Sequence, residues 1–142
     1  MNVSKVGVDL IKQFEGCKLR AYRDAVSVLT CGWGSTGPDI RDDTVWTQEQ
    51  ADKRLMTHLE LVEGCLDRNV TVPLNQNQFD ALACWIYNLG CGNFQASTLL
   101  KKLNAGDYAA VPDQIRRWNR AGTNVLAGLT KRREAEAALF QA

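Results

Sequence analysis

The chain has 142 residues, of which 45% are hydrophobic and 23% are charged. This length suits one domain, residues 1–142, with a core that buries roughly 70% of the surface of the unfolded chain. The net charge of +1 gives no overall attraction to nucleic acid. No segment reaches the roughly 18 apolar residues of a membrane-spanning helix. Lys5, Asp9 and Lys12 interrupt the N-terminal segment, so we expect no signal peptide, no stable membrane insertion and synthesis in the cytoplasm.

The charges are unevenly distributed. Residues 1–100 carry 9 Lys or Arg and 12 Asp or Glu, a net −3, whereas residues 101–142 carry 8 and 4, a net +4. This asymmetry suits an anionic ligand that lies against the C-terminal part. On charge alone, the basic side chains at 116–120 and 131–133 are more typical of a solvated helix face.

The cysteines do not form a recognisable metal site. They are Cys17, Cys31, Cys65, Cys84 and Cys91. No CxxC pair is present and His58 is the only histidine, so the spacing of a zinc site is absent. We expect free, mostly buried thiols in a reducing cytoplasm. One disulfide could form if the protein reaches an oxidising compartment. A catalytic cysteine is disfavoured, because such a nucleophile needs a nearby base and the chain has a single histidine.

The first predicted helix carries an acidic residue at its end. Apolar residues recur at helical spacing from Val6 to Phe14, Ser4 is a candidate N-cap, and Gly16 is a natural stop. Glu15 therefore falls in the last turn, where the negative end of the helix dipole favours the protonated carboxyl that a general acid needs. The simpler alternative is an exposed glutamate at a helix end.

Residues 17–40 predict a small, twisted antiparallel sheet with tight turns, because short apolar runs alternate with Gly, Asp and Pro. Asp24 lies at such a turn and Thr30 in the following β-like run. Gly32, Gly34 and Gly37 either allow close approach of a ligand or only form turns.

A capping box at Thr47 begins a long helix, which we expect to join a small β-containing lobe to a larger helical lobe. Its apolar stripe consists of Ala51, Leu55, Leu59, Val62 and Leu66. His58, on the flank of the stripe, is expected at the surface.

The remaining sequence is predicted to be helical. Asn75 caps a segment that is apolar nearly all round and suits the centre of the helical lobe. Ser97 and Asp107 each begin a short helix, with Pro112 near a helix start, and residues 118–124 form a turn-rich loop. The final helix is expected to begin at Thr130 and to turn Ala135, Ala138 and Leu139 inward.

Glu15, Asp24 and Thr30 together match the requirements of glycosidic bond cleavage. This reaction needs a proton donor beside the leaving oxygen and a carboxylate that stabilises an oxocarbenium-like state or activates water. A hydroxyl can help to hold that water. The spacing alone is weak evidence, because these residue types are common.

The surrounding sequence resembles the phage-type lysozymes of glycoside hydrolase family 24. The segment IKQFEGCKLRAYRD at 11–24 carries the strongest resemblance, and it extends over nearly the whole chain. The further matching segments are 36–40, 78–83, 88–94, 97–104, 118–122 and 128–136.

The resemblance implies an α+β, lysozyme-like fold with a cleft between the two lobes. It implies an endolysin that hydrolyses the β-1,4 bond between N-acetylmuramic acid and N-acetylglucosamine in peptidoglycan and lyses the host. Glu15 would be the general acid, and Asp24 and Thr30 would activate water with inversion. Neither a metal nor another cofactor is implied, and we expect a monomer. Arg133 would pair with Glu15, and Gly34, Ser35 and Arg133 are candidates for substrate binding.

Two residues depart from the family pattern. Ser27 stands where relatives often have Gly, which strains a turn that needs positive φ. Ser35 stands where relatives often have His, so a pH-sensitive ion pair is missing. Many relatives also carry an N-terminal signal-arrest-release segment; without one, export would depend on a holin-type pore.

Three alternative functions remain at this point. A lytic transglycosylase needs one acid and no activated water, which leaves Asp24 and Thr30 without a purpose. A non-catalytic peptidoglycan-binding module would use the same scaffold, because fold alone does not establish function. A secreted antibacterial effector would use the same chemistry in another context.

Overall fold

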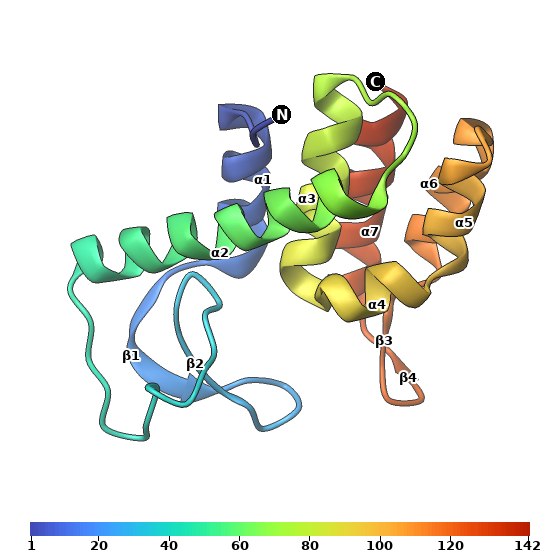
Figure 1. Ribbon diagram of the computed structural model, residues 1–142. Helices are drawn as coiled ribbons and strands as arrows, with labels where there is room; N and C mark the ends of the chain where they lie inside the picture. The colour runs from blue at the N-terminus through green and yellow to red at the C-terminus, as the bar shows by residue number, and fades with distance from the viewer.

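The computed structural model describes residues 1–142 and consists of helices with two small two-stranded sheets (Figure 1). Its elements are α1 (Lys5–Glu15), β1 (Lys18–Arg23), β2 (Leu29–Gly32), α2 (Gln48–Asn69), α3 (Gln76–Leu89), α4 (Cys91–Ala96), α5 (Thr98–Asn104), η1 (Tyr108–Ala110), α6 (Val111–Arg116), β3 (Arg120–Ala121), β4 (Asn124–Val125) and α7 (Ala127–Gln141). None of the helices is both long and apolar enough to cross a membrane.

The β-containing lobe is built on the predicted antiparallel pair of β1 and β2. Tyr22 lies opposite Thr30 and Arg23 opposite Leu29, with an irregularity between residues 18 and 22. The turn between the strands contains Ser27 at φ 66°, the only non-glycine residue with positive φ. This confirms the strained turn that the sequence predicts at this position.

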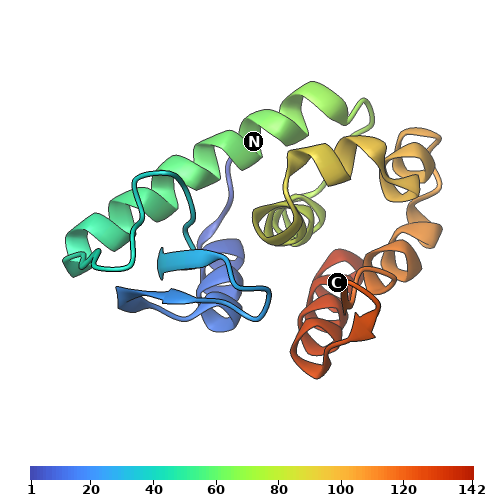
Figure 2. The same cartoon turned by 90° about the horizontal axis from the view of Figure 1, so that it is seen from below.

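Helix α2 connects the two lobes, as Figure 2 shows from below. The Thr47 side chain accepts a hydrogen bond from the Gln50 amide, and the Gln50 side chain accepts one from the Thr47 amide, so the predicted capping box is present. Every residue of the predicted apolar stripe is buried. The prediction of a long linking helix is therefore confirmed.

Helix α3 forms the centre of the helical lobe, where α1, α2, α4 and α7 contact it. Every residue from Phe79 to Tyr87 is buried. The Asn75 side chain caps the helix through the Gln78 amide, and the Ser97 hydroxyl caps α5 in the same way through the Leu100 amide. Pro112 lies in the first turn of α6, where its missing N–H costs nothing.

The C-terminal part differs from its prediction. The loop at 118–124 contains part of the hairpin β3–β4, and α7 begins at Ala127 rather than Thr130. Ala138 is exposed. The buried face consists instead of Arg132, Arg133, Glu136, Ala137 and Phe140. The apolar spacing is therefore only partly right: Leu139 is half-buried against the core, but three of the buried positions are charged and form ion pairs within the protein.

The expectation that all cysteines are free thiols is wrong for one pair. Cys65 near the end of α2 and Cys91 at the start of α4 form a disulfide, with their Cα atoms 5.9 Å apart. Cys17, Cys31 and Cys84 are free, and the last two are buried. The bridge therefore joins two helices that both pack on α3.

The disulfide closes a loop of 26 residues. Replacing both Cys65 and Cys91 by Ala should therefore lower the free energy of unfolding by about 3–4 kcal/mol, chiefly because the unfolded chain gains freedom. Urea unfolding followed by tryptophan fluorescence measures this loss.

Cys17→Ala, which removes a free and partly exposed thiol, is the matched control. Dithiothreitol should lower the unfolding midpoint of the wild type and of this control and leave the double variant unchanged. A wild-type midpoint that ignores the reductant would show that the bridge adds no stability.

Candidate active site

Glu15 is the last residue of α1, as the sequence predicts. Gly16 adopts φ 65°, and its amide donates to the Lys12 carbonyl, which ends the helix and directs the chain into β1. The Glu15 side chain is 15% exposed. The partly buried carboxyl thus belongs to the residue at which α1 ends, just before the chain enters β1 (Figure 1).

The turn after β2 packs directly against Glu15. A Cβ atom at Gly34 would overlap Glu15 Oε1, and Gly34 adopts φ 76°. The turn is held in place from two helices: the Tyr87 hydroxyl of α3 donates to the Trp33 carbonyl at 2.6 Å, and Trp33 Nε1 donates to Asp52 Oδ1 of α2 at 2.8 Å. Gly34 is therefore required both for its backbone conformation and for the space that it leaves to Glu15.

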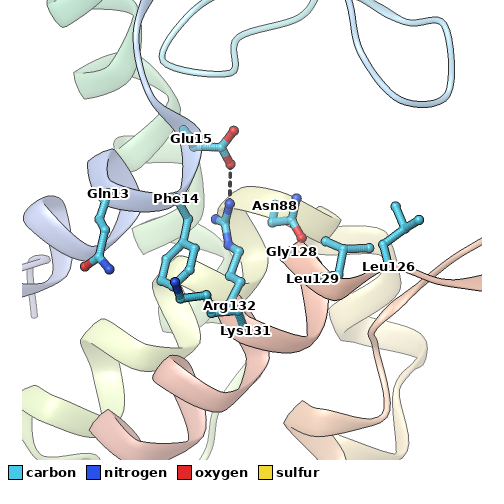
Figure 3. Close-up of a pocket in the computed structure, with 9 residues that line it drawn as sticks. All are labelled: Gln13, Phe14, Glu15, Asn88, Leu126, Gly128, Leu129, Lys131 and Arg132. Carbon is cyan, nitrogen blue, oxygen red and sulfur yellow. Dashed lines mark hydrogen bonds and ion pairs between the residues drawn. The ribbon is translucent and has the colours of Figure 1, made fainter.

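The other oxygen of Glu15 is held by Arg132. Its Nη1 donates to Glu15 Oε2 at 2.6 Å, shown by the dashed line in Figure 3. The prediction that Arg133 pairs with Glu15 is wrong, because the Arg133 side chain is 1% exposed and pairs with Glu136 at 2.8 Å. One residue along a helix turns the side chain by about 100°, so the two arginines face different partners.

Tyr22 of β1 lies within the electrostatic influence of both Glu15 and Asp24. Burial raises the pKa of Tyr22, and the nearby charges of Glu15 and Asp24 raise it further. Tyr22 is also the register partner of Thr30. The charges of Glu15 and Asp24 thus both act on one tyrosine of the sheet, which the sequence argument did not identify.

Asp24 shapes the turn that contains Ser27. Its Oδ1 accepts hydrogen bonds from the amides of Val26 and Val28, both at 2.9 Å. Because both bonds use Oδ1, Oδ2 is left to accept from another donor.

Thr30 is 3% exposed, and its hydroxyl donates to the Val28 carbonyl at 2.9 Å. Its hydrogen is committed to that carbonyl, so the Thr30 oxygen acts toward other groups as an acceptor.

A pocket of about 570 Å³ opens beside Glu15, between the ends of α1 and α3 and the start of α7 (Figure 3). It is lined by Gln13, Phe14, Glu15, Asn88, Leu126, Gly128, Leu129, Lys131 and Arg132. Two cations of the basic C-terminal part face this pocket. Asp24 and Thr30, which belong to the sheet region, are not among its lining residues.

Ser35 lies at a different surface from this pocket. It is 2% exposed and lines a separate hollow of about 220 Å³ with Arg54 and His58 among others. His58 stacks on Tyr87 with ring centroids 4.0 Å apart, and burial, together with the charge of Arg54, lowers the pKa of His58. The expectation of a simple surface histidine is therefore wrong.

The sequence argument missed Arg132, Asn88 and Glu136 as residues connected to Glu15. The sequence shows two adjacent arginines at this point of the helix. It does not show which of them faces Glu15, because that depends on the rotation of the helix about its axis. No cluster of three or more His, Cys, Asp or Glu side chains is placed to hold a metal ion.

Comparison with known proteins gives consistent similarities. Residues 12–136 match the family described as phage lysozyme. The endolysin of Acyrthosiphon pisum secondary endosymbiont phage 1 is 41% identical over 99% of this chain and 99% of its own length. The SAR-endolysin of Escherichia phage Mu is 45% identical over 84% of this chain and 69% of its own length. The chain spans nearly all of some relatives and about half of others.

Among solved structures, the muramidase domain of SpmX from Asticaccaulis excentricus is 34% identical, with a TM-score of 0.89 over 99% of this chain and 98% of that chain. The similarities confirm the α+β, lysozyme-like fold that the sequence predicts.

The contact between Gly34 and Glu15 can be tested with Gly34→Ala. The new methyl group should displace the Glu15 carboxyl and the turn, so we expect stability to fall by more than about 1 kcal/mol and wall-clearing activity by roughly tenfold or more. Chemical denaturation and a turbidity assay measure the two effects.

Gly106→Ala is the matched control, because Gly106 adopts φ 82° and a Cβ there meets nothing within 4 Å. It should lose about 1 kcal/mol from backbone strain and keep its activity. Equal activities of the two variants would contradict the role assigned to Gly34.

Proposed function

The chain belongs to the phage lysozyme family and is a lysozyme-type glycoside hydrolase, and from this premise we propose that Glu15, Asp24 and Thr30 carry its chemistry. The proposed substrate is the β-1,4 bond between N-acetylmuramic acid and N-acetylglucosamine in peptidoglycan. The observation that carries the proposal is the position of Glu15: one oxygen is held by Arg132, the other faces Gly34, and the carboxyl borders a pocket of about 570 Å³.

In the proposed reaction Glu15 protonates the glycosidic oxygen as the bond breaks. Oε2 accepts the hydrogen bond of Arg132, so the transferable proton is carried by Oε1. Fixing one oxygen orients the other, and such positioning lowers the barrier by reducing the freedom that must be lost in the transition state.

Asp24 and Thr30 are proposed to hold and activate the attacking water. Asp24 Oδ2 is free of the hydrogen bonds that fix Oδ1, so it can accept a proton from water. Thr30 Oγ1 donates to the Val28 carbonyl, so it can accept a second hydrogen bond from the same water. Direct attack by this water would invert the anomeric carbon.

The alternatives from the sequence are less well supported. A lytic transglycosylase would close the sugar on itself and would not use the acceptors on Asp24 and Thr30. A non-catalytic binding module would not need the buried arginine that orients Glu15, because a buried ion pair is costly unless it is well satisfied.

Release to the cell wall is proposed to follow synthesis in the host cytoplasm and passage through a holin-type pore. Some relatives are SAR-endolysins, so a membrane-release route is the competing proposal. Requirement for a co-expressed holin, measured as the timing of lysis, distinguishes the two routes.

Glu15→Gln tests the proposed general acid. The variant keeps the shape of the side chain but has no proton to donate, so we expect at least a 100-fold loss of wall clearing with an unchanged circular dichroism spectrum.

Glu60→Gln, at an exposed position on α2, is the control and should retain full activity. Near-full activity of Glu15→Gln would refute the proposed role.

Product analysis tests the bond and the water together. Digestion of purified peptidoglycan should release fragments with a reducing N-acetylmuramic acid end, formed first as the α-anomer because attack from the opposite face inverts the β-bond. Anomer-resolved NMR with mass spectrometry measures this. An initial β-anomer would exclude inversion, and anhydro-muramoyl ends would establish the transglycosylase.

A further inference from the structure

A line of buried charges runs from Glu15 into the helical lobe. Arg132 contacts Glu15 at 2.6 Å and Glu136 at 3.3 Å, and Glu136 contacts Arg133 at 2.8 Å. Arg133 Nη2 then donates to Asn88 Oδ1 at 2.8 Å, and Asn88 lines the pocket beside Glu15. The line thus begins at Glu15 and ends at Asn88, both of which line the pocket shown in Figure 3.

Arg132 has no freedom to turn away from Glu15. Besides its bond to Glu15, its Nε donates to Glu136 Oε2 and its Nη2 donates to the Cys84 carbonyl of α3 at 3.0 Å. Glu136 Oε2 also accepts from Arg133 at 3.2 Å. Glu136 therefore holds both arginines: Oε2 contacts each of them, and Oε1 lies 2.8 Å from Arg133 Nε.

The four charges balance when Glu15 is ionised, and three of them lie where water does not reach. The side chains of Arg132, Arg133 and Glu136 are 5%, 1% and 0% exposed. Two cations and two anions alternate along the line. Because screening is weak inside a protein, removing one charge changes the electrostatic potential at its neighbours.

The other titratable groups that face this line contribute little charge at neutral pH. They are Tyr22 of β1 and Tyr87 and Cys84 of α3, and burial is the main cause of the raised pKa of each. Lys131 of α7 lines the pocket itself. The balance at Glu15 is therefore set mainly by Arg132, Arg133 and Glu136.

We propose that Glu136 and Arg133 are positioning residues that fix the orientation of Arg132 and the net charge acting on Glu15, and so set the pH range in which the enzyme works. The proposal rests on the role of Glu15 as general acid. Neither residue is among those that line the pocket. Glu136 acts through Arg132, and Arg133 acts through Glu136 and Asn88.

Glu136→Gln is the first test, because it keeps the size of the side chain and removes one negative charge. The line then carries a net positive charge, which stabilises the ionised form of Glu15. We expect the basic limb of the kcat/KM–pH profile to move down by about one pH unit, which corresponds to a tenfold change in protonation.

Arg133→Gln should have the opposite effect, because the line then carries a net negative charge and the basic limb should move up. The double variant restores the balance, so its basic limb should return toward that of the wild type. A merely structural role would lower activity in each variant without these opposite shifts. If Glu136→Gln alone does not fold, the shift between Arg133→Gln and the charge-balanced double variant decides the question.

Glu134→Gln is the matched control, because Glu134 lies on the same helix, is 56% exposed and pairs with Arg116 outside the line. Its profile should match that of the wild type. Unmoved limbs in the Glu136 and Arg133 variants, with Glu15→Gln inactive, would overturn the positioning proposal alone. Activity in Glu15→Gln would instead overturn the proposed function.

Discussion

The ion pair between Glu15 and Arg132 is the interaction on which the rest of the site depends. It joins the end of α1 to α7 across 117 positions of the chain. Taking two charges out of water is costly, and the cost is offset only where the remaining hydrogen-bonding groups are also satisfied. Here the Cys84 carbonyl and Glu136 supply those partners, which explains why α7 turns charged residues toward the core.

The turn after β2 packs directly against this ion pair. Gly34 contacts Oε1 of Glu15, while Trp33 forms hydrogen bonds with both α2 and α3. These contacts help to fix the position of the small lobe relative to Glu15. A larger residue at Gly34 would therefore meet the Glu15 carboxyl directly.

Local signals in the sequence predicted much of the fold and the central residue of the site. The capping residues Thr47 and Asn75 and the stop at Gly16 are short-range features, so they defined helix ends correctly. The sequence did not show which of Arg132 and Arg133 pairs with Glu15. The orientation of a helix is predicted from the spacing of its apolar residues, and this spacing is misleading where the buried face carries charged residues. The disulfide could not be predicted either, because a pairing among five cysteines depends on distances in the folded chain.

The disulfide also has a mechanical consequence. It fastens only the C-terminal end of α2, at Cys65, to the helical lobe, while the other end carries the small sheet (Figure 2). Helix α2 thus has one end that a disulfide fixes to the helical lobe and one end that no disulfide fixes. Apart from the main chain, the small sheet is held to the rest of the protein by hydrogen bonds and packing, such as the bond from the Tyr87 hydroxyl to the turn after β2.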